Sequence, residues 1–465
     1  MAATTAAVLA TLAIVAQDGS ALRAAPTAQA AVLTPLPAGE LLEVRGQRLD
    51  HLQVWNHRLE RGGFIQASQL RLLGTAEADA PQHLAVLRFL RDTPGAESLA
   101  IGYVAAYLRA APATAITAEP FDVLGTVAER LARRAGSAPA VAAQMDVAGG
   151  YGVRFTSFER SGAMQVCYDG EAFRRVLALQ PTPAQQARAA LALTRPDCQD
   201  PAGPAHLREA ADRARITLLD AADRGTALDG ATRNRLRSRR AGVWAAIAYS
   251  EARRGRPAAL AAQQAVDALA AVDKAELGDD ESAEYVDAAL RVGAVRQAAL
   301  PPAAATGALR LVAQPGEPGQ TCLTLQPAAG QAVLAQRCTF ALVWPGSVRV
   351  NADSTALALA VQPLDGWTEL WVWRRTPDGW VQEVLPPAAG TPGLGYAEFA
   401  GWAPGGGGRL LLAREARTDG RLTRRFEVMA LDGFRLDRSA SAPQLLAAFN
   451  SWADAGWKRG TVSQR

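Results

Sequence analysis

Residues 41–73 read LLEVRGQRLDHLQVWNHRLERGGFIQASQLRLL and are the most informative part of the chain. Leu42 and Val44 fall on one face of an expected strand, while Glu43 falls on the other. The alternation resumes at residues 52–54 and then meets an arginine-rich turn that closes with two glycines. A period of two residues, punctuated by turns, is typical of β-strands with one buried face. The stretch therefore predicts a small domain of short strands and tight turns.

Two motifs support this interpretation. ALRAAPT at residues 21–27 reads as an opening strand that runs into a loop, and HLQV at residues 51–54 followed by GGFIQASQL at residues 62–70 reads as the ending. The combination resembles the bacterial SH3 family, whose members pair an LNVRSGPS-like opening with a glycine- and tryptophan-containing ending. Two positions depart from the family pattern: His51 stands where an aromatic residue is usual, and Phe64 replaces the common tryptophan.

The resemblance implies an SH3-like β-barrel over residues 18–75. It also implies that the barrel binds a peptide or a peptidoglycan-type ligand of the cell wall on a shallow surface between loops. Aromatic side chains would supply most of the contact energy on such a surface. The candidate ligand-binding residues are His51, Trp55 and Phe64. The alternative for Phe64 is the barrel core, because aromatic side chains on barrel strands are usually buried.

Residues 1–17, MAATTAAVLATLAIVAQ, have the character of a leader, specifically a signal peptide. The uncharged apolar run at residues 6–16 is too short to span a bilayer but fits the hydrophobic region of a secretory signal, with cleavage before Gln17 or Asp18. The first basic residue is Arg23, so the positive start of a signal is missing and a disordered alanine-rich leader is the alternative. We expect a periplasmic or exported protein without a transmembrane anchor.

The four cysteines fall into two local pairs, Cys167 with Cys198 and Cys322 with Cys338. An even number in separate pairs suits disulfides formed in an oxidising compartment, which agrees with export. Closing the shorter of the two loops would stabilise the fold by about 3 kcal/mol on the chain-entropy argument. The alternative is four buried free thiols, since free cysteine is often interior. No cysteine has metal-site spacing to another cysteine or to a histidine.

Residues 76–300 change to the periodicity of helices. Apolar residues recur at helical spacing in residues 81–93, a Pro-Gly stop follows, and the pattern then repeats, which predicts stacked helical hairpins. Residues 149–168 interrupt the helices with two alternating segments around a Ser-Gly turn, which predicts an inserted β-hairpin. Residues 243–272 resemble one tetratricopeptide-type helix pair, but no 34-residue period runs through the region.

One basic run, RNRLRSRR at residues 233–240, raises the question of a nucleic-acid surface. Leu236 interrupts the run at helical spacing, and the acidic residues Asp220, Asp223 and Asp229 lie close to it in the sequence. No aromatic residue is interleaved for base stacking, so a solvated helix face is the better interpretation. We expect no nucleic-acid partner.

The C-terminal third reads as β-structure. Residues 301–307 are a linker by composition, and residues 308–465 carry strand patterns up to a short terminal helix at residues 443–452. Residues 357–380 are echoed by residues 410–434 at an offset of about fifty residues, as strands around Asp-Gly turns.

Repeated units of this kind resemble β-propeller blades. Only about three would fit in this length, fewer than a closed ring normally needs. An open sheet, a sandwich and a ring completed by a partner chain all remain open. Trp371 and Trp373 point to one face of their strand and are further candidate ligand-binding residues if that face is exposed.

Motifs of catalytic and cofactor sites do not appear in the sequence. The histidines at positions 51, 57, 83 and 206 are isolated from one another and from the cysteines. There is no G-x-S-x-G, H-E-x-x-H or phosphate-binding loop. We therefore expect no catalytic residue, no metal and no cofactor.

Together these features predict a multidomain α+β protein: an SH3-like barrel, a central helical domain with one β-hairpin, and a C-terminal all-β domain. Apolar residues make up 49% and charged residues 20% of the chain, which is ordinary for globular domains. The predicted function is non-enzymatic binding or scaffolding at the cell envelope. Two alternatives stay open: a cell-envelope hydrolase acting on glycan or peptide through two converging carboxylates, and a cytosolic helical-repeat adaptor.

Overall fold

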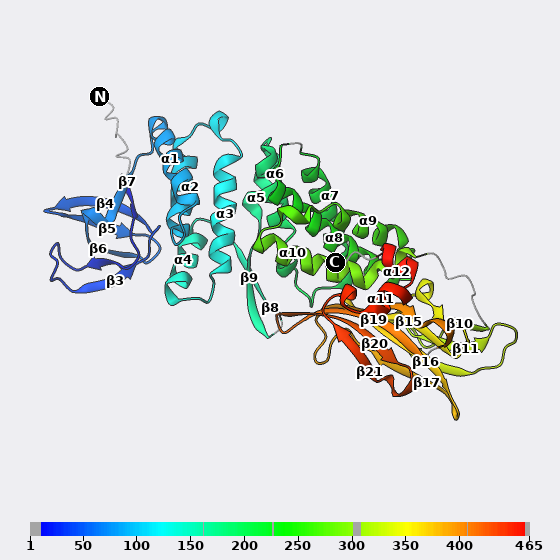
Figure 1. Cartoon of the computed structure of the whole chain (residues 1–465). Helices are drawn as coiled ribbons and strands as arrows, with labels where there is room; N and C mark the ends of the chain where they lie inside the picture. The colour runs from blue at the N-terminus through cyan, green and yellow to red at the C-terminus, as the bar shows by residue number, and fades with distance from the viewer. Residues whose placement is uncertain (1–10, 161, 226, 301–307, 407, 461–465) are drawn as a thin grey trace. The chain divides into compact units, whose positions relative to one another are not determined.

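The computed structural model is shown in Figure 1 and describes residues 11–160, 162–225, 227–300, 308–406 and 408–460. The chain forms two compact units, Met1–Gly203 and Pro204–Arg465. The architecture is mixed α+β, as predicted: an antiparallel sheet begins the chain, helices form its middle, and a sheet-rich region follows. The boundary between the units falls inside the predicted helical domain, so its helices divide between them. The predicted linker lies outside the described residues.

The N-terminal sheet has seven antiparallel strands in the order β3-β2-β6-β5-β4-β1-β7. Their bounds are β1 (Thr11–Val15), β2 (Ser20–Arg23), β3 (Val32–Leu36), β4 (Leu41–Arg48), β5 (His51–Asn56), β6 (Arg61–Gln66) and β7 (Leu70–Leu73). The strands expected in residues 41–73 are present, and the apolar side chains on one face of each strand fill the core. Leu42, Val54 and Ile65 lie in one buried cluster, each on a different strand.

The apolar run that predicts a leader over residues 1–17 supplies a strand of this sheet, β1. It pairs with β4 on one side and with β7 on the other, and Ala13, Ile14 and Val15 are fully buried. A buried strand and the hydrophobic region of a signal share the same feature, a short uncharged apolar run, so the sequence alone does not separate them. Within the described residues the first strand begins at Thr11, earlier than predicted, and cleavage at the predicted position would remove an interior strand.

Six helices follow in the first unit: α1 (Ala80–Arg91), α2 (Glu97–Ala110), α3 (Glu119–Arg133), α4 (Pro139–Gly150), α5 (Glu171–Ala178) and α6 (Pro183–Leu193). They share a core with the sheet, because Ile14 of β1 lies in the same buried cluster as Leu87 of α1 and Ile101 of α2. The predicted β-hairpin is present as β8 (Phe155–Arg160) and β9 (Ala163–Tyr168).

The turn before β4 brings the sheet into direct contact with the helices. Gly39 has a φ of +87°, and a Cβ there would lie 2.4 Å from the carbonyl oxygen of Ser98. The Ser98 hydroxyl donates to the carbonyl of Ala38 at 2.6 Å, and the Tyr151 hydroxyl donates to the carbonyl of Gly39 at 2.9 Å. Only glycine combines this backbone conformation with so close an approach. The sheet is thus fixed to α2 and to the end of α4.

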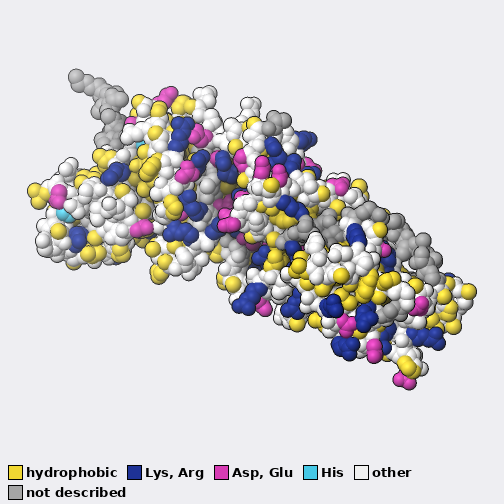
Figure 2. Space-filling model, viewed as in Figure 1, with side chains coloured by type: hydrophobic (Ala, Val, Ile, Leu, Met, Phe, Trp, Pro, Cys, Tyr) yellow, Lys and Arg dark blue, Asp and Glu magenta, His cyan; other side chains and the backbone are white. Residues whose placement is uncertain are grey.

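Four helices begin the second unit: α7 (Ala205–Asp223), α8 (Gly230–Arg253), α9 (Ala259–Ala270) and α10 (Asp279–Val295). The basic run of residues 233–240 lies on α8 and faces its neighbours. Arg240 contacts Asp220 at 2.8 Å and Asp223 at 3.1 Å, and Arg239 contacts Glu284 of α10 at 3.2 Å. Figure 2 shows basic and acidic side chains intermixed over the helices. The run therefore joins helices through ion pairs, where the sequence predicts a solvated face.

Two sheets complete the second unit. β10 (Leu309–Pro315), β11 (Thr321–Pro327) and β12 (Ala335–Thr339) form a three-stranded sheet. The larger sheet has the order β13-β15-β16-β18-β19-β20-β21, with β14 on β15 and β17 on β16. Its strands are β13 (Leu342–Val343), β14 (Arg349–Val350), β15 (Ala356–Leu364), β16 (Trp367–Thr376), β17 (Gly379–Leu385), β18 (Leu394–Trp402), β19 (Arg409–Thr418), β20 (Arg421–Ala430) and β21 (Leu436–Ala440). α11 (Ala447–Trp452) and α12 (Ala455–Gly460) follow, in agreement with the predicted terminal helix.

The internal echo corresponds to two three-stranded meanders, β15-β16-β17 and β19-β20-β21, within the larger sheet. The meanders are joined through β18, which pairs with β16 only at Trp367 and Thr368. Leu370 of β16 and Leu410 of β19 share one buried cluster. The candidates Trp371 and Trp373 point to the opposite face of β16, where they pack with β11 in another cluster.

Trp371 and Trp373 are therefore core residues and not exposed ligand contacts. They are 4% and 2% exposed. The sequence places them correctly on one face of β16 but cannot show that the small sheet covers this face, because the covering strands come from a separate part of the chain.

Both predicted disulfides are confirmed. Cys167 of β9 is bonded to Cys198, with the Cα atoms 5.7 Å apart. Cys322 and Cys338 are bonded across opposite positions of β11 and β12. No cysteine is free, so the alternative of four buried thiols is wrong.

Removing β1 is expected to unfold the N-terminal sheet. A chain that starts at Thr11 keeps β1, whereas one that starts at Asp18 loses it together with three buried side chains. Their burial contributes roughly 4–7 kcal/mol, which is comparable to the whole stability of a typical domain. Circular dichroism with thermal unfolding should show the transitions of the full chain for the first truncation and the loss of one transition for the second. Equal unfolding of both truncations would contradict the role of β1.

Candidate functional site

The outward face of β4, β5 and β6 carries the candidate site. Glu43 of β4 lies opposite Trp55 of β5, and Trp55 lies opposite Gly62 of β6. The flanking residues Val54 and Ile65 point into the core of the sheet. Because side chains alternate along a strand, the row from Glu43 to Gly62 faces away from that core.

The indole ring of Trp55 packs against the backbone of Gly62, which has no side chain. A Cβ at Gly62 would lie 3.0 Å from Cε3 of the indole, so the missing side chain gives the ring its place. Arg45 contacts the ring as well, with its guanidinium carbon 4.6 Å from the ring centroid, which is a cation–π contact. The register of β4 against β5 shifts between Val44 and Gly46, so Arg45 occupies a bulge. Bulges redirect side chains, and this one brings the guanidinium to the ring.

Glu43 connects this pair to the turn after β5. Its carboxylate accepts a hydrogen bond from Nε of Arg45 at 3.3 Å, and its Oε2 lies 2.7 Å from Nε2 of His57. The hydrogen bond from Arg45, followed by that from His57, lowers the pKa of Glu43. Glu43 is therefore ionised over the neutral range, and the row presents a carboxylate, a guanidinium and an aromatic ring side by side.

The turn that carries His57 is held in place by the carboxylate of Glu40. Asn56 is fully buried and donates from Nδ2 to Oε1 of Glu40 at 3.0 Å. Arg58 donates from Nη2 to Oε2 of the same carboxylate at 2.7 Å, and this hydrogen bond raises the pKa of Arg58. A buried carboxylate is tolerated when charged and neutral donors satisfy its oxygens. His57 is thus placed next to Glu43 by its two neighbours in the sequence.

Phe64 extends the outward face along β6. It lies opposite Gln53 of β5 on one side and opposite Arg23 of β2 on the other, and it is half-buried. Beyond β2 the sheet ends at β3, where Val32 and Leu33 are exposed. Figure 2 shows hydrophobic side chains interspersed with single charged ones over this part of the chain. The surface from Trp55 to β3, which we call the outward face, therefore combines partly exposed apolar groups with the edge strand β3, whose Leu33 carbonyl accepts a hydrogen bond from Nη1 of Arg61.

The three residues proposed from the family resemblance have different positions. Trp55 and Phe64 lie on the outward face, half-buried. His51 does not contribute to an open surface, because it is only 4% exposed and its Nδ1 lies 2.7 Å from Oδ1 of Asp50. The sequence missed Arg45 and Glu43, although both share the period of the outward-facing positions of β4; the bulge that brings Arg45 to the ring has no local signature.

The Glu43 carboxyl should titrate below the ordinary range for glutamate in the folded protein. Since Arg45 is the largest cause of the lowered pKa, Arg45→Ala should raise the pKa more than His57→Ala does, whereas Arg48→Ala, at an exposed position of the same strand, should leave it unchanged. As pH falls through the lowered pKa, Glu43 becomes neutral and its ion pairs are lost. Side-chain carboxyl NMR against pH measures this directly. The same Glu43 titration in the native and Arg45→Ala proteins would contradict the arrangement.

In the described ranges, no group of three or more His, Cys, Asp or Glu side chains is placed to hold a metal ion. The helices within those ranges include none with the length and apolar character needed to cross a membrane. Comparisons with protein-family models, with curated proteins and with solved structures found no match to this chain.

Proposed function

We propose that the protein is a non-enzymatic binding or scaffolding protein of the cell envelope, and that its SH3-like N-terminal domain recognises a peptide or a peptidoglycan-type ligand. The observation that carries this proposal is the position of Trp55 on the outward face, over Gly62 and against Arg45. A half-buried tryptophan that is held by neighbours on the outer side of a sheet offers a rigid apolar contact at little cost in conformational entropy.

The groups around Trp55 favour an extended peptide-like ligand with charged ends or side chains. Trp55 and Phe64 supply apolar area, and Arg45 and Glu43 supply one charge of each sign within the same row. Stem peptides of cell-wall polymers carry both free carboxylates and amino groups, which such a row can pair with. β3 lies at the edge of the sheet, where the carbonyl of Leu33 already accepts a hydrogen bond from Nη1 of Arg61 at 3.2 Å. The contacts proposed for the ligand are therefore mainly those of side chains.

The disulfides support the proposed compartment. Two disulfides are typical of proteins that fold in an oxidising environment. They support a periplasmic or exported location, where a peptidoglycan-type ligand is within reach. A cytosolic adaptor would not be expected to keep both bonds.

A sedimentation assay with purified peptidoglycan tests the proposal. Trp55→Ala and Phe64→Ala should each lower the retained fraction, with an apparent affinity about tenfold weaker, because aromatic contacts at binding surfaces contribute on the order of 1–2 kcal/mol. Phe89→Ala is the matched control, since Phe89 is 73% exposed on α1 and lies outside the outward face. Thermal unfolding of each variant shows whether the fold is kept.

Two results would contradict the proposal. Retention that is the same for the Trp55 and Phe89 variants would remove the outward face from binding. Soluble fragments released from the peptidoglycan by the wild-type chain would instead support the alternative of a cell-envelope hydrolase.

A further inference from the structure

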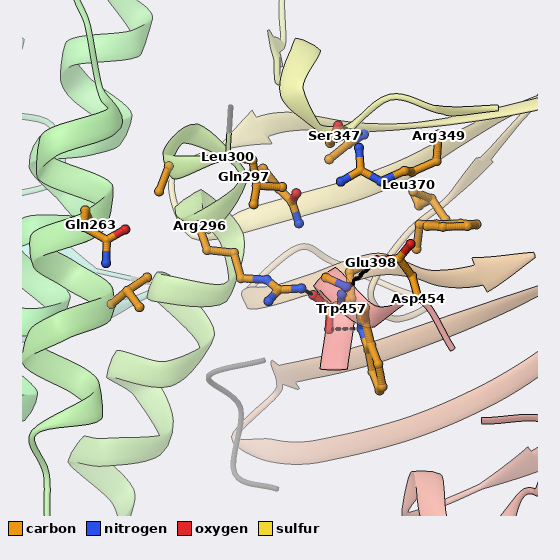
Figure 3. A pocket seen from close by; sticks show the side chains of 15 residues that line it. Gln263, Arg296, Gln297, Leu300, Ser347, Arg349, Leu370, Glu398, Asp454 and Trp457 are labelled. Atoms are coloured by element: carbon orange, nitrogen blue, oxygen red, sulfur yellow. Dashed lines mark hydrogen bonds and ion pairs between the residues drawn. The ribbon is translucent and has the colours of Figure 1, made fainter. Parts of the chain in front are cut away.

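The second unit contains a cavity of about 170 Å³ between its helices and its larger sheet. Arg296 and Gln297, just after α10, line one side, and Arg349 of β14 and Trp457 of α12 line the others (Figure 3). Phe399 of β18 is also a lining residue. The cavity brings together segments that are far apart in the sequence, and all of its lining residues belong to the second unit.

One part of the cavity wall is internally neutralised. Glu398 is 3% exposed and accepts a hydrogen bond from Nε1 of Trp457 at 2.8 Å. Its second oxygen forms an ion pair with Arg296. Figure 3 shows the three side chains converging on one another. Since the carboxylate is matched by a guanidinium, this group closes the wall without adding net charge to the cavity.

Arg349 differs from Arg296 in having no acidic partner. Its Nη1 donates to the backbone carbonyls of Gly346 at 3.0 Å and Val348 at 2.8 Å. Within the described part of the chain Arg349 forms no ion pair, and only its Nη1 donates a hydrogen bond. The N–H groups of Nε and Nη2 therefore remain available to a ligand. These two nitrogens form the side of the guanidinium that binds a carboxylate in bidentate fashion. Gln297 also lines the cavity, and its backbone carbonyl accepts a hydrogen bond from the N–H of Leu300. Its side-chain amide makes no hydrogen bond within the described residues and adds a second polar group.

The rest of the lining is apolar and limits the size of a ligand. Leu370, Phe399 and the indole of Trp457 supply hydrocarbon surface. A cavity of about 150 Å³ is large enough to hold benzene, so this one accommodates a six-membered ring with one small substituent. Pockets for small molecules commonly combine such apolar walls with a few polar groups that fix orientation.

We infer that this cavity binds a small organic anion, with an apolar body against Phe399 and Trp457 and its acidic group on Arg349. The lining also holds Asp454, whose Oδ1 accepts hydrogen bonds from the backbone N–H groups of Gly456 and Trp457 at 2.7 and 3.1 Å. The guanidinium of Arg349, which no described carboxylate pairs, favours an anion over a neutral molecule of the same shape. A carboxylate fits the planar Nε–Nη2 edge and the small volume best; a phosphoryl group shares the same chemistry and is larger.

Titration calorimetry on the full chain with three probes tests the inference. Benzoate should bind, benzamide should bind about tenfold or more weakly because it lacks the charge, and phenylphosphonate should fall between them. Tighter binding of phenylphosphonate than of benzoate would still support an anion site and would identify the acidic group as phosphoryl. No benzoate binding at millimolar concentration, or equal binding of benzoate and benzamide, would overturn the inference.

Variants connect the binding to Arg349. Arg349→Gln should weaken benzoate binding about tenfold or more. Arg310→Gln is the matched control, since Arg310 also donates to a backbone carbonyl, that of Gly330, but does not line the cavity. Gln297→Leu, which keeps all contacts of Arg349, should weaken benzoate binding less than Arg349→Gln does. Unchanged binding in an Arg349→Gln protein with a native thermal transition would contradict the assignment.

Discussion

The first unit depends on one strand that belongs to two cores. On β1, Ala13 and Val15 lie in the core of the sheet, while Ile14 between them lies in the core of the helices. Because neighbouring side chains on a strand point to opposite faces, a single short strand fixes the sheet to the helical layer. The contact of Gly39 with Ser98 adds a second attachment at the turn before β4. The helices therefore occupy the β1 side of the sheet and leave β5, β6 and β2 to face outward.

On the outward face, each functional side chain is held in place by a neighbouring residue. Gly62 leaves room for the Trp55 ring, a bulge in β4 brings Arg45 to it, and Glu43 joins Arg45 to His57. Each of these side chains is held by a neighbour, so little freedom is lost when a ligand binds, which favours affinity. In the second unit, ion pairs are used differently: those of α8 join helices, and that of Glu398 closes a cavity wall.

Local sequence patterns predicted the strands and disulfides correctly, but they did not predict which residues distant segments bury. The alternation of Leu42 with Glu43 gave the correct faces of β4, and the cysteine pairs gave both disulfides. Burial by distant segments was not predictable in this way. His51 has the outward parity of Trp55 and is nevertheless buried, and Trp371 is covered by strands from another part of the chain. The cavity has no local signature at all, because Arg296 and Glu398 are 102 residues apart.

Hydrogen–deuterium exchange of the full chain, with and without soluble peptidoglycan fragments, tests the binding role of the outward face most directly. The ligand should slow exchange of backbone amides in β5 and β6 and at the edge strand β3, because contacts there restrict local opening. Amides of β16, which carries the buried Trp371, should exchange at the same rate in both samples. Protection confined to the second unit, or no protection of β5 and β6 at saturating ligand, would contradict the account.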